Sequence, residues 1–591
     1  MKQYWKQHWF EYVLSAVLVS LAAGALTVLF GYSFSTNDDA MLRSIVSGSY
    51  TGTPEAHLIY IMYPLGFIGQ CLYMLLPHVP WYDIFMTVTH YLCWFLVIGR
   101  IGEQFQSKKG KLIAVFASFL AILLLDAPYV VMHQYTILAA WFAVVAILFL
   151  LTSKEQKGFA FWSDRILCLV FLVLCLWLRK QVFILALPIG AIILVLEFIR
   201  DAKQLKIRAV LAGKIVFIAV FAVLTIASFL VERKAYNTPE WQEFLAYNEA
   251  RTDIYDYYTV PSYEEGGTFW EEAGLSYADY LAIDLYNSEL VEELSLSNLQ
   301  SLANIAKTRW EAGYGLKSMV RIMIESVVRE VLYNPVQPMG LILTGLLICT
   351  VISCVFTNEK KEIIGITVLY VFLGAVVGYF AWRTRFPERV SYGLYLMAAA
   401  FLTGILTGAL SKKRSGEAIV EEKNNFGKFW ISFAIVCSVV LIAGAGLYRF
   451  RELKEKNNAI QINYADWVAI NDYFAQYPEY KFCIDTYSFV FTTERMFTAD
   501  TEEASVLRLG TWVQASPLQK KRYERNGLEG TLAAQAESEG ICFVQAAERG
   551  KEWLSQRWFE KGFDAEPKVI DTIVTPSGHK FKVMQPAKKS E

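Results

Sequence analysis

Two adjacent carboxylates, Asp38 and Asp39, stand just after the first long apolar stretch of the sequence. They precede residues 41–47, whose spacing of apolar residues predicts a short helix. Two interpretations are open. Asn37 or Asp38 caps that helix through its first free amides, or a carboxylate beside a membrane surface, its pKa raised by partial burial, acts as a general base.

Two groups of cations are the natural counterparts of this acidic pair. Arg179 and Lys180 end one apolar stretch, and Arg383, Arg385 and Arg389 follow another within seven residues. Guanidinium groups bind phosphate in a bidentate manner and do not lose their charge, so these residues predict an anion site. The competing interpretations are snorkelling of Arg179 and Lys180 to lipid phosphates, and a surface patch of ion pairs around Glu388.

The segment from Glu249 to Glu293 is both acidic and aromatic. It holds twelve acids and a single basic residue, Arg251. Aromatic faces beside carboxylates suit sugars, whose hydroxyls donate to acids while their C–H faces stack on rings. The segment therefore predicts a sugar-binding surface, for which the candidates are Tyr257, Tyr258 and Trp270. A helical lid with its own aromatic core explains most of the same residues.

Membrane-spanning helices must position these groups. Of the 591 residues, 55% are hydrophobic and 15% aromatic, which excludes a wholly soluble enzyme and a disordered chain. The 55 Lys and Arg residues balance 56 Asp and Glu residues, so no basic excess indicates a nucleic-acid partner. A helix crosses a bilayer with roughly 20 apolar residues. Eleven such segments are predicted: residues 12–31, 82–101, 112–127, 129–151, 163–179, 182–199, 209–231, 337–357, 362–381, 391–410 and 427–449.

The apolar stretch 58–76 decides the topology. If it lies along the membrane surface instead of spanning, every short loop rich in Lys and Arg falls on one side, the cytoplasmic side by the positive-inside rule. We therefore expect a multi-pass protein of the cell membrane with a cytoplasmic N-terminus. Loops 32–81 and 232–336 and the C-terminal region then lie outside.

Two domains are predicted. Residues 1–450 form the membrane domain, and residues 451–591, where helical and strand patterns alternate, form a small extracytoplasmic α/β domain. Predicted elements of the latter are a helix at 464–476, strands at 481–485, 541–545, 569–574 and 580–585, and a helix at 549–563. Cys483 and Cys542 fall in two of these strands, as a disulfide or as two buried thiols.

Several of these features resemble the GT-C superfamily of integral-membrane glycosyltransferases, and are similar to bacterial relatives of protein O-mannosyltransferases and lipid A aminoarabinose transferases. The resemblance rests on Asp38-Asp39 in the first outer loop, on surface helices within 40–76, on Tyr63-Pro64-Leu65 where relatives often carry a proline-rich motif, on the late-loop arginines and on a soluble C-terminal domain. The Pro-Pro motif of relatives is missing here. The resemblance implies sugar transfer from a polyprenyl-phosphate-linked donor, such as an undecaprenyl-phosphate-linked sugar, to a glycan or cell-wall acceptor on the outer face.

In that chemistry Asp38 or Asp39 is the base, and the arginines hold the leaving phosphate. No cofactor is indicated, and the sequence leaves open whether a divalent metal takes part and what the oligomeric state is. Two other classes compete with a transferase. A transporter or polymerase of lipid-linked glycans would also need outward arginines, and a noncatalytic wall-binding membrane protein would not need the acidic pair.

Overall fold

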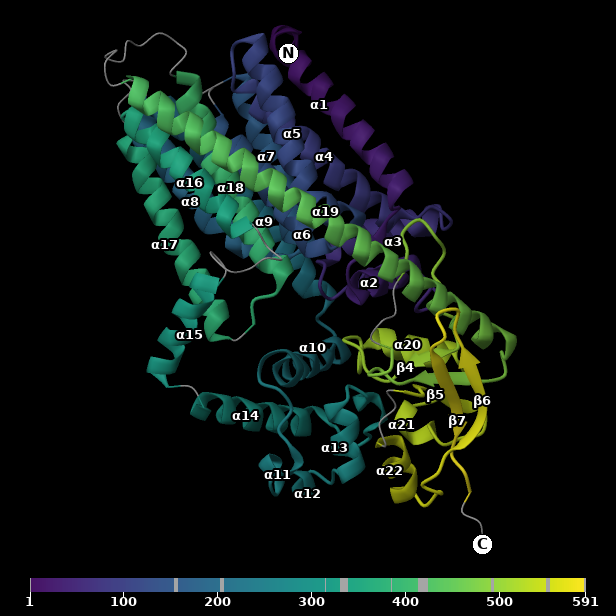
Figure 1. The fold of residues 1–591 in the computed structure, drawn as a ribbon. Helices are drawn as coiled ribbons and strands as arrows, with labels where there is room; N and C mark the ends of the chain where they lie inside the picture. The colour runs from purple at the N-terminus through teal and green to yellow at the C-terminus, as the bar shows by residue number, and fades with distance from the viewer. Residues whose placement is uncertain are drawn as a thin grey trace.

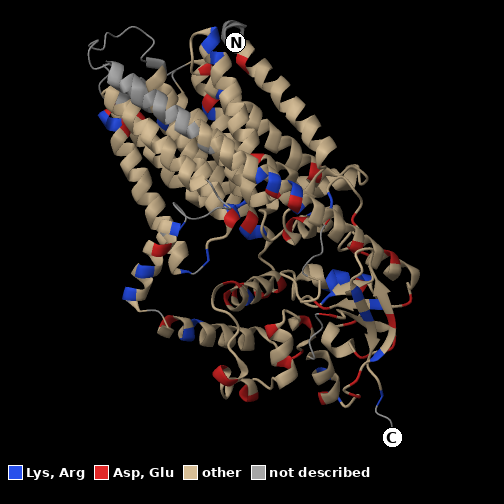
Figure 2. Ribbon diagram, in the orientation of Figure 1, with Lys and Arg blue, Asp and Glu red and all other residues tan. Residues whose placement is uncertain are grey.

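The computed structural model describes residues 2–153, 158–201, 207–313, 315–329, 339–383, 385–412, 424–489, 494–548 and 553–588. Long helices form a bundle, and the remaining elements gather at the end of the bundle opposite the N-terminus (Figure 1). Charged residues are sparse along the bundle and concentrate near its ends and in the attached lobe (Figure 2). This distribution is typical of a membrane-spanning bundle with an aqueous domain.

Within the described residues, ten helices are long and apolar enough to cross a membrane. They correspond to the first ten predicted spans. The eleventh, 427–449, falls in the long helix α19 (Asn424–Gln476), and the side chains of residues 424–438 lie outside the described part. The ten are contained in α1 (Lys2–Leu29), α4 (Trp81–Glu103), α5 (Lys108–Val131), α6 (Tyr135–Thr152), α7 (Phe159–Leu178), α8 (Lys180–Asp201), α9 (Ile207–Ala235), α16 (Met339–Phe356), α17 (Lys360–Trp382) and α18 (Glu388–Lys412).

The helix α6 is the centre of the bundle. Its residues are apolar on every side, and all of them are buried, as expected for a helix surrounded by others. It packs against α4, α7, α8 and α18. The residues that flank α6 are therefore held on a rigid support.

Residues 58–76 do not cross the bundle. They contain α3 (Tyr63–Leu75), whose 13 residues span about 20 Å at 1.5 Å per residue, less than a bilayer core of about 30 Å. The first outer loop also contains α2 (Asn37–Ser47). Gly48 ends α2 in a left-handed conformation, and a Cβ there would collide with the backbone of Pro54. Both helices lie at the end of the bundle that carries the lobe (Figure 1).

The lobe combines the second outer loop with the C-terminal region. The loop elements are α10 (Pro239–Thr252), the π-helical turn η1 (Asp253–Tyr257), α11 (Tyr263–Gly266), α12 (Phe269–Glu272), α13 (Tyr277–Asp284), η2 (Ser288–Leu290), α14 (Leu296–Gly313) and α15 (Leu316–Val328). Side chains from residues 247–306 share one apolar core with side chains from residues 483–584. The two segments approach closely at Gly510, because a Cβ there would overlap the carbonyl oxygen of Tyr286.

The C-terminal region is the expected α/β domain. Its five-stranded sheet has the order β4-β3-β5-β7-β6, in which β4, β3 and β5 are parallel and β7 is antiparallel to both β5 and β6. The predicted boundary at residue 450 lies inside α19, which continues from the bundle to Gln476 without a break. The elements are β3 (Lys481–Ile484), β4 (Val506–Arg508), α20 (Pro517–Arg525), α21 (Leu532–Gln535), β5 (Ile541–Ala546), α22 (Trp553–Glu560), β6 (Lys568–Val574) and β7 (Lys580–Gln585).

The two cysteines of this sheet are free thiols. Phe482 pairs with Cys542, and Cys483 pairs with Phe543. Paired residues share a face and successive residues alternate, so Cys483 and Cys542 point to opposite faces and pack in different cores. The disulfide interpretation is wrong for this geometric reason.

Candidate functional site

A cavity of about 1260 Å³ lies where the bundle meets the lobe. Its walls come from α2, the first turns of α8 and α18, the second outer loop and the C-terminal domain. Of the predicted site residues it brings together Asp38, Arg179, Lys180, Tyr257, Arg385 and Arg389. Asp39, Tyr258, Trp270 and Arg383 do not line it.

A short two-stranded sheet fixes the position of Asp38. The strand β1 (Ser33–Phe34) pairs in parallel with β2 (Met132–His133) at the end of α5, and the amide of Ser35 donates to the carbonyl of His133 at 2.8 Å. Helix α2 then begins at once, with Thr36 as its N-cap and no side-chain capping bond. The capping interpretation for Asn37 or Asp38 is therefore wrong.

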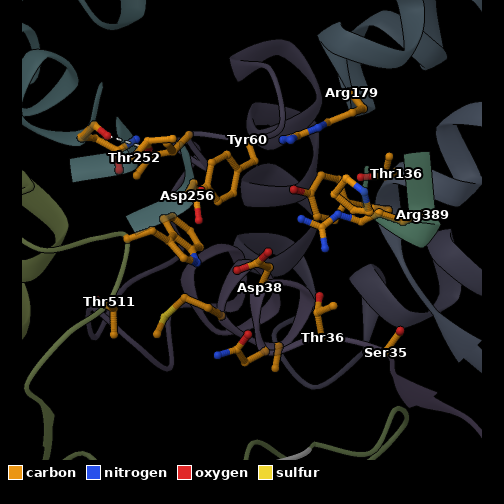
Figure 3. A pocket seen from close by; sticks show the side chains of 18 of the residues that line it. Ser35, Thr36, Asp38, Tyr60, Thr136, Arg179, Thr252, Asp256, Arg389 and Thr511 are labelled. Carbon is orange, nitrogen blue, oxygen red and sulfur yellow. Dashed lines mark hydrogen bonds between the residues drawn. The ribbon is translucent and has the colours of Figure 1, made fainter. Parts of the chain in front are cut away.

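Asp38 lines the cavity near Tyr60, Asp256 and the guanidinium of Arg389 (Figure 3). Burial raises the pKa of its carboxyl above the ordinary value, and the charges of Arg389 and Arg179 act against this rise. A carboxylate with a raised pKa is a better proton acceptor than an exposed one. The cavity thus contains a carboxyl group with a raised pKa and two cations near it.

Asp39 has different surroundings from its neighbour. It is fully buried; its Oδ1 accepts from the Tyr82 hydroxyl and from the Tyr135 amide, both at 3.1 Å, and its Oδ2 accepts from the Thr36 hydroxyl at 3.2 Å. Burial and the like charge of Asp38 raise its pKa to about 8. Asp39 therefore links α2 to α4 and α6, and is mainly protonated at neutral pH.

Arg179 and Arg389 supply the positive charge of the cavity. Among the described residues, neither has a carboxylate within ion-pair distance. The guanidinium of Arg179 lies over the rings of Tyr60 and Tyr135, at 5.3 and 5.2 Å from their centroids. Rings orient a cation without cancelling its charge, so Arg179 stays available to an anion.

The other two late-loop arginines have partners within the protein. Arg385 forms an ion pair with Asp256 at 2.7 Å. Arg383 donates to the Tyr258 hydroxyl at 2.8 Å and lies 4.3 Å from the centroid of the Tyr257 ring. Of the predicted trio, Arg389 therefore has the charge most free to meet a ligand.

Glu388 does not pair with the neighbouring arginines in the way that the surface-patch interpretation expects. It accepts from Arg449 of α19 at 3.2 Å and from the Tyr129 hydroxyl of α5 at 2.5 Å. These contacts anchor the first turn of α18. The next residue, Arg389, is thereby held at the cavity wall.

The predicted aromatic residues divide between cavity and core. Tyr257 lines the cavity, whereas Tyr258 is buried, does not line it and accepts from Arg383. Trp270 is fully buried in the core of the lobe, with the ring of Tyr263 stacked at 5.8 Å. Its position does not support the prediction that it contacts an acceptor, since the lobe uses this large side chain for its own packing. Lys180 lines the cavity and lies 3.7 Å from Glu232.

Sequence reasoning missed the contribution of the C-terminal domain. Glu494, Asp500, Glu502, Arg508 and Arg522 line the cavity, although more than 100 residues separate them from every predicted site residue. No local pattern marks them. Tyr60 was also missed. It could have been found as an aromatic residue in the predicted surface segment, just before α3.

Within the described residues, no group of three or more His, Cys, Asp or Glu side chains could hold a metal ion.

The chain is thus a helical multi-spanning membrane protein with an α/β domain that covers a charged cavity. It is similar to the crystal structure of ArnT from Cupriavidus metallidurans bound to undecaprenyl phosphate, with 14% identity and a TM-score of 0.39 over 96% of this chain and 97% of that one. The apo structure of the same ArnT gives 12% identity and a TM-score of 0.37 over the same shares. No family model matches the sequence, and no curated protein matches it. At this level the likeness assigns no role to any residue.

Proposed function

We propose that the protein is a membrane glycosyltransferase that moves a sugar from a polyprenyl-phosphate-linked donor to a cell-surface acceptor. One observation carries the proposal: Asp38 faces two cations, Arg179 and Arg389, inside one cavity. A base and a phosphate clamp on either side of one space are what transfer from a phosphate leaving group requires.

An apolar branch of the cavity supports a lipid-linked donor. Val182 and Leu185 of α8 and Phe372 and Val376 of α17 line it, and these two helices pack against each other. Arg179 precedes α8 by one residue and lines the same cavity, so the cation lies next to the first turn of one of these helices. A prenyl chain would fit between the helices and leave its phosphate beside the guanidinium groups.

The reaction then follows from the two kinds of group. Asp38 takes the proton from an acceptor hydroxyl while that oxygen forms a bond to the anomeric carbon of the donor sugar. The bond from this carbon to the phosphate oxygen breaks, and its electron pair stays on the polyprenyl phosphate. Arg179 and Arg389 stabilise the charge that grows on this leaving group more strongly in the transition state than in the ground state. Attack opposite the leaving group inverts the anomeric configuration.

The other predicted residues have supporting roles in this proposal. Asp39 holds α2 in position, Arg385 and Arg383 order η1 through Asp256 and the two tyrosines, and Tyr257 contacts the sugar. Lys180 adds a charge near the leaving phosphate. The distribution of Lys and Arg in short loops assigns the cavity to the outer face, with the N-terminus in the cytoplasm.

Envelope glycan analysis tests the proposal in cells. A deletion strain should lack one glycan modification, and expression of the wild-type chain should restore it. Asp38→Asn and Arg389→Ala should insert normally and fail to restore it. Arg321→Gln is the matched control, because Arg321 is exposed on α15 and pairs only with Glu325 among described carboxylates. Restoration by Asp38→Asn at wild-type levels would refute the assignment of the base.

A further inference from the structure

The residues that line the cavity fall into two sets of different character. Ser44, Ser49 and Tyr50 of the first outer loop line it together with Glu502, Arg508 and Thr511 of the C-terminal domain, and we call this set the polar branch. Asp38 lines the same cavity as this polar branch and the apolar branch of α8 and α17, and Thr511 and Arg179 lie on different sides of Asp38 (Figure 3).

The polar branch coincides with the ligand-binding edge of an open α/β sheet. Ile484 and Arg508 are the last residues of the parallel strands β3 and β4, and Thr486 and Thr511 follow them in the chain. All four line the cavity. In open α/β sheets, ligands bind beyond the carboxyl ends of parallel strands. The domain therefore turns this edge toward Asp38.

Backbone contacts hold the domain in this orientation. The amide of Phe34 in β1 donates to the Glu494 carbonyl at 3.3 Å, and the amide of Met496 donates to the Tyr32 carbonyl at 3.0 Å. Arg43 of α2 is buried and forms ion pairs with Glu494 and Asp500, at 3.3 and 2.5 Å. The same short segment that positions Asp38 is thus bonded to the C-terminal domain.

The charges of the polar branch are balanced internally. Glu502 pairs with Arg508 at 2.5 Å and with Arg522 at 3.5 Å, and Glu494 and Asp500 share Arg43. Among the described residues, the cations that line the branch, Arg508 and Arg522, are thus paired, unlike Arg179 and Arg389. Its hydroxyls and paired charges offer donors and acceptors, and the rings of Trp512 and Tyr60, 4.7 Å apart, add an aromatic surface.

We infer that this polar branch is the acceptor subsite, and that it binds an uncharged, polyhydroxylated carbohydrate chain whose end hydroxyl reaches Asp38. Sugars combine hydroxyls that match paired ionic groups with C–H faces that stack on rings. A lipid tail would remove water from these paired charges and hydroxyls and offer no hydrogen bonds in return. The assignment of the subsite to an acceptor rests on the proposed transferase function, since it requires the donor to occupy the other branch.

Photo-cross-linking in the full-length protein tests the two branches separately. The photoreactive residue p-benzoylphenylalanine replaces Thr511 in the polar branch, Phe372 in the apolar branch, or Val574, an exposed residue of β6 on the domain surface. Whole cells with an intact envelope are irradiated, and the adducts on the purified protein are identified by mass spectrometry. We expect carbohydrate on the Thr511 variant, prenyl phosphate on the Phe372 variant and neither on the Val574 variant.

The outcomes separate the two hypotheses. A peptide, a lipid chain or no adduct at Thr511 overturns the carbohydrate subsite. Carbohydrate at Thr511 without prenyl phosphate at Phe372 keeps the subsite and refutes the proposed donor. Arg508→Gln in the Thr511 background should reduce carbohydrate capture at least fivefold, and in the Phe372 background it should leave prenyl phosphate capture unchanged. Arg321→Gln should change neither, and thermal unfolding confirms that each variant is folded.

Discussion

Replacement of Asp38 and of Asp39 by asparagine should have very different consequences, although the two residues are neighbours. Asp38→Asn removes a proton acceptor from the cavity. A positioned general base contributes about 10²- to 10⁴-fold to a rate, which corresponds to about 2.7–5.5 kcal/mol of activation free energy. We therefore expect the turnover of Asp38→Asn to fall by about that factor.

Asp39→Asn should lose much less. Because the pKa of Asp39 is raised to about 8, the wild-type side chain is already mainly neutral at pH 7. The Oδ1 of an asparagine can still accept from the Tyr82 hydroxyl and the Tyr135 amide. Its amide can donate to the Thr36 hydroxyl, so the exchange preserves the contacts. At acidic pH, where Asp39 is neutral in both the folded and the unfolded chain, we expect a stability change of less than about 1 kcal/mol for Asp39→Asn, against about 2–5 kcal/mol for Asp39→Ala, which leaves buried donors without an acceptor. At neutral pH Asp39→Asn should be the more stable protein, because folding of the wild-type chain must then take up a proton.

Proteoliposomes with purified protein give the direct comparison. Synthetic polyprenyl-phosphate-linked hexoses serve as donors, and donor loss and polyprenyl phosphate release are followed by mass spectrometry. Binding of undecaprenyl phosphate should stay intact in both variants, because neither removes a cation. The reasoning is refuted if Asp38→Asn turns over at the wild-type rate, or if Asp39→Asn is the more damaged enzyme while both are equally folded.

The rate of transfer should rise with pH as Asp38 loses its proton. Arg389→Gln removes a charge that lowers the pKa of Asp38, so the acidic limb of the pH–rate profile should move to higher pH. An unmoved limb would place Arg389 away from the base. The folded-state pKa of Asp39, about 8, exceeds its ordinary value of 3.8. The contribution of Asp39 to stability should therefore decline as pH rises between these values, by at most about 1.4 kcal/mol per pH unit. Thermal unfolding of Asp39→Asn should show less of this decline, and a pH profile identical to that of the wild type would contradict the raised pKa of Asp39. Trp270→Ala empties a fully buried site and should cost about 3–5 kcal/mol without changing the acceptor KM of the protein that remains folded; a raised KM at unchanged stability would restore Trp270 to the acceptor site.

The spanning helices were predictable because one local quantity determines them. A run of about 20 apolar residues is enough to identify a span, and the ten that fall on described residues were predicted. The surface position of 58–76 followed from the distribution of Lys and Arg in the loops, and the 13 residues of α3 agree with it. Strands β3, β5, β6 and β7 alternate apolar and polar residues or are fully buried, and they too were predicted. Strand β4 was missed because its three residues are too short for a periodic signal.

The cavity was predictable only in part, because residue type gives no information about long-range partners. Asp38 and Asp39 have the same side chain, and only the fold exposes one to the cavity and surrounds the other with hydrogen-bond donors. Glu502 and Arg508 reach the cavity only because the C-terminal domain contacts the first outer loop, from which both residues are more than 400 positions away in the sequence.

Partners within the chain decide which arginine is available to a ligand. Arg385 and Arg389 are four residues apart and equally capable of binding phosphate, but Asp256 neutralises Arg385, whereas Glu388, the carboxylate next to Arg389, is engaged by Arg449 from α19. Pairing with a carboxylate of the same chain occupies the donors that a phosphate would use, and removing a partly exposed pair changes stability by only about 0.2–1 kcal/mol. A cation therefore becomes available to a ligand when the fold directs its nearest acids elsewhere. We therefore expect Asp256→Asn, which frees Arg385, to strengthen binding of undecaprenyl phosphate, and Arg389→Ala to weaken it. Vesicle co-sedimentation with labelled undecaprenyl phosphate measures both effects. Weaker binding by Asp256→Asn would show that the ion pair itself shapes the site.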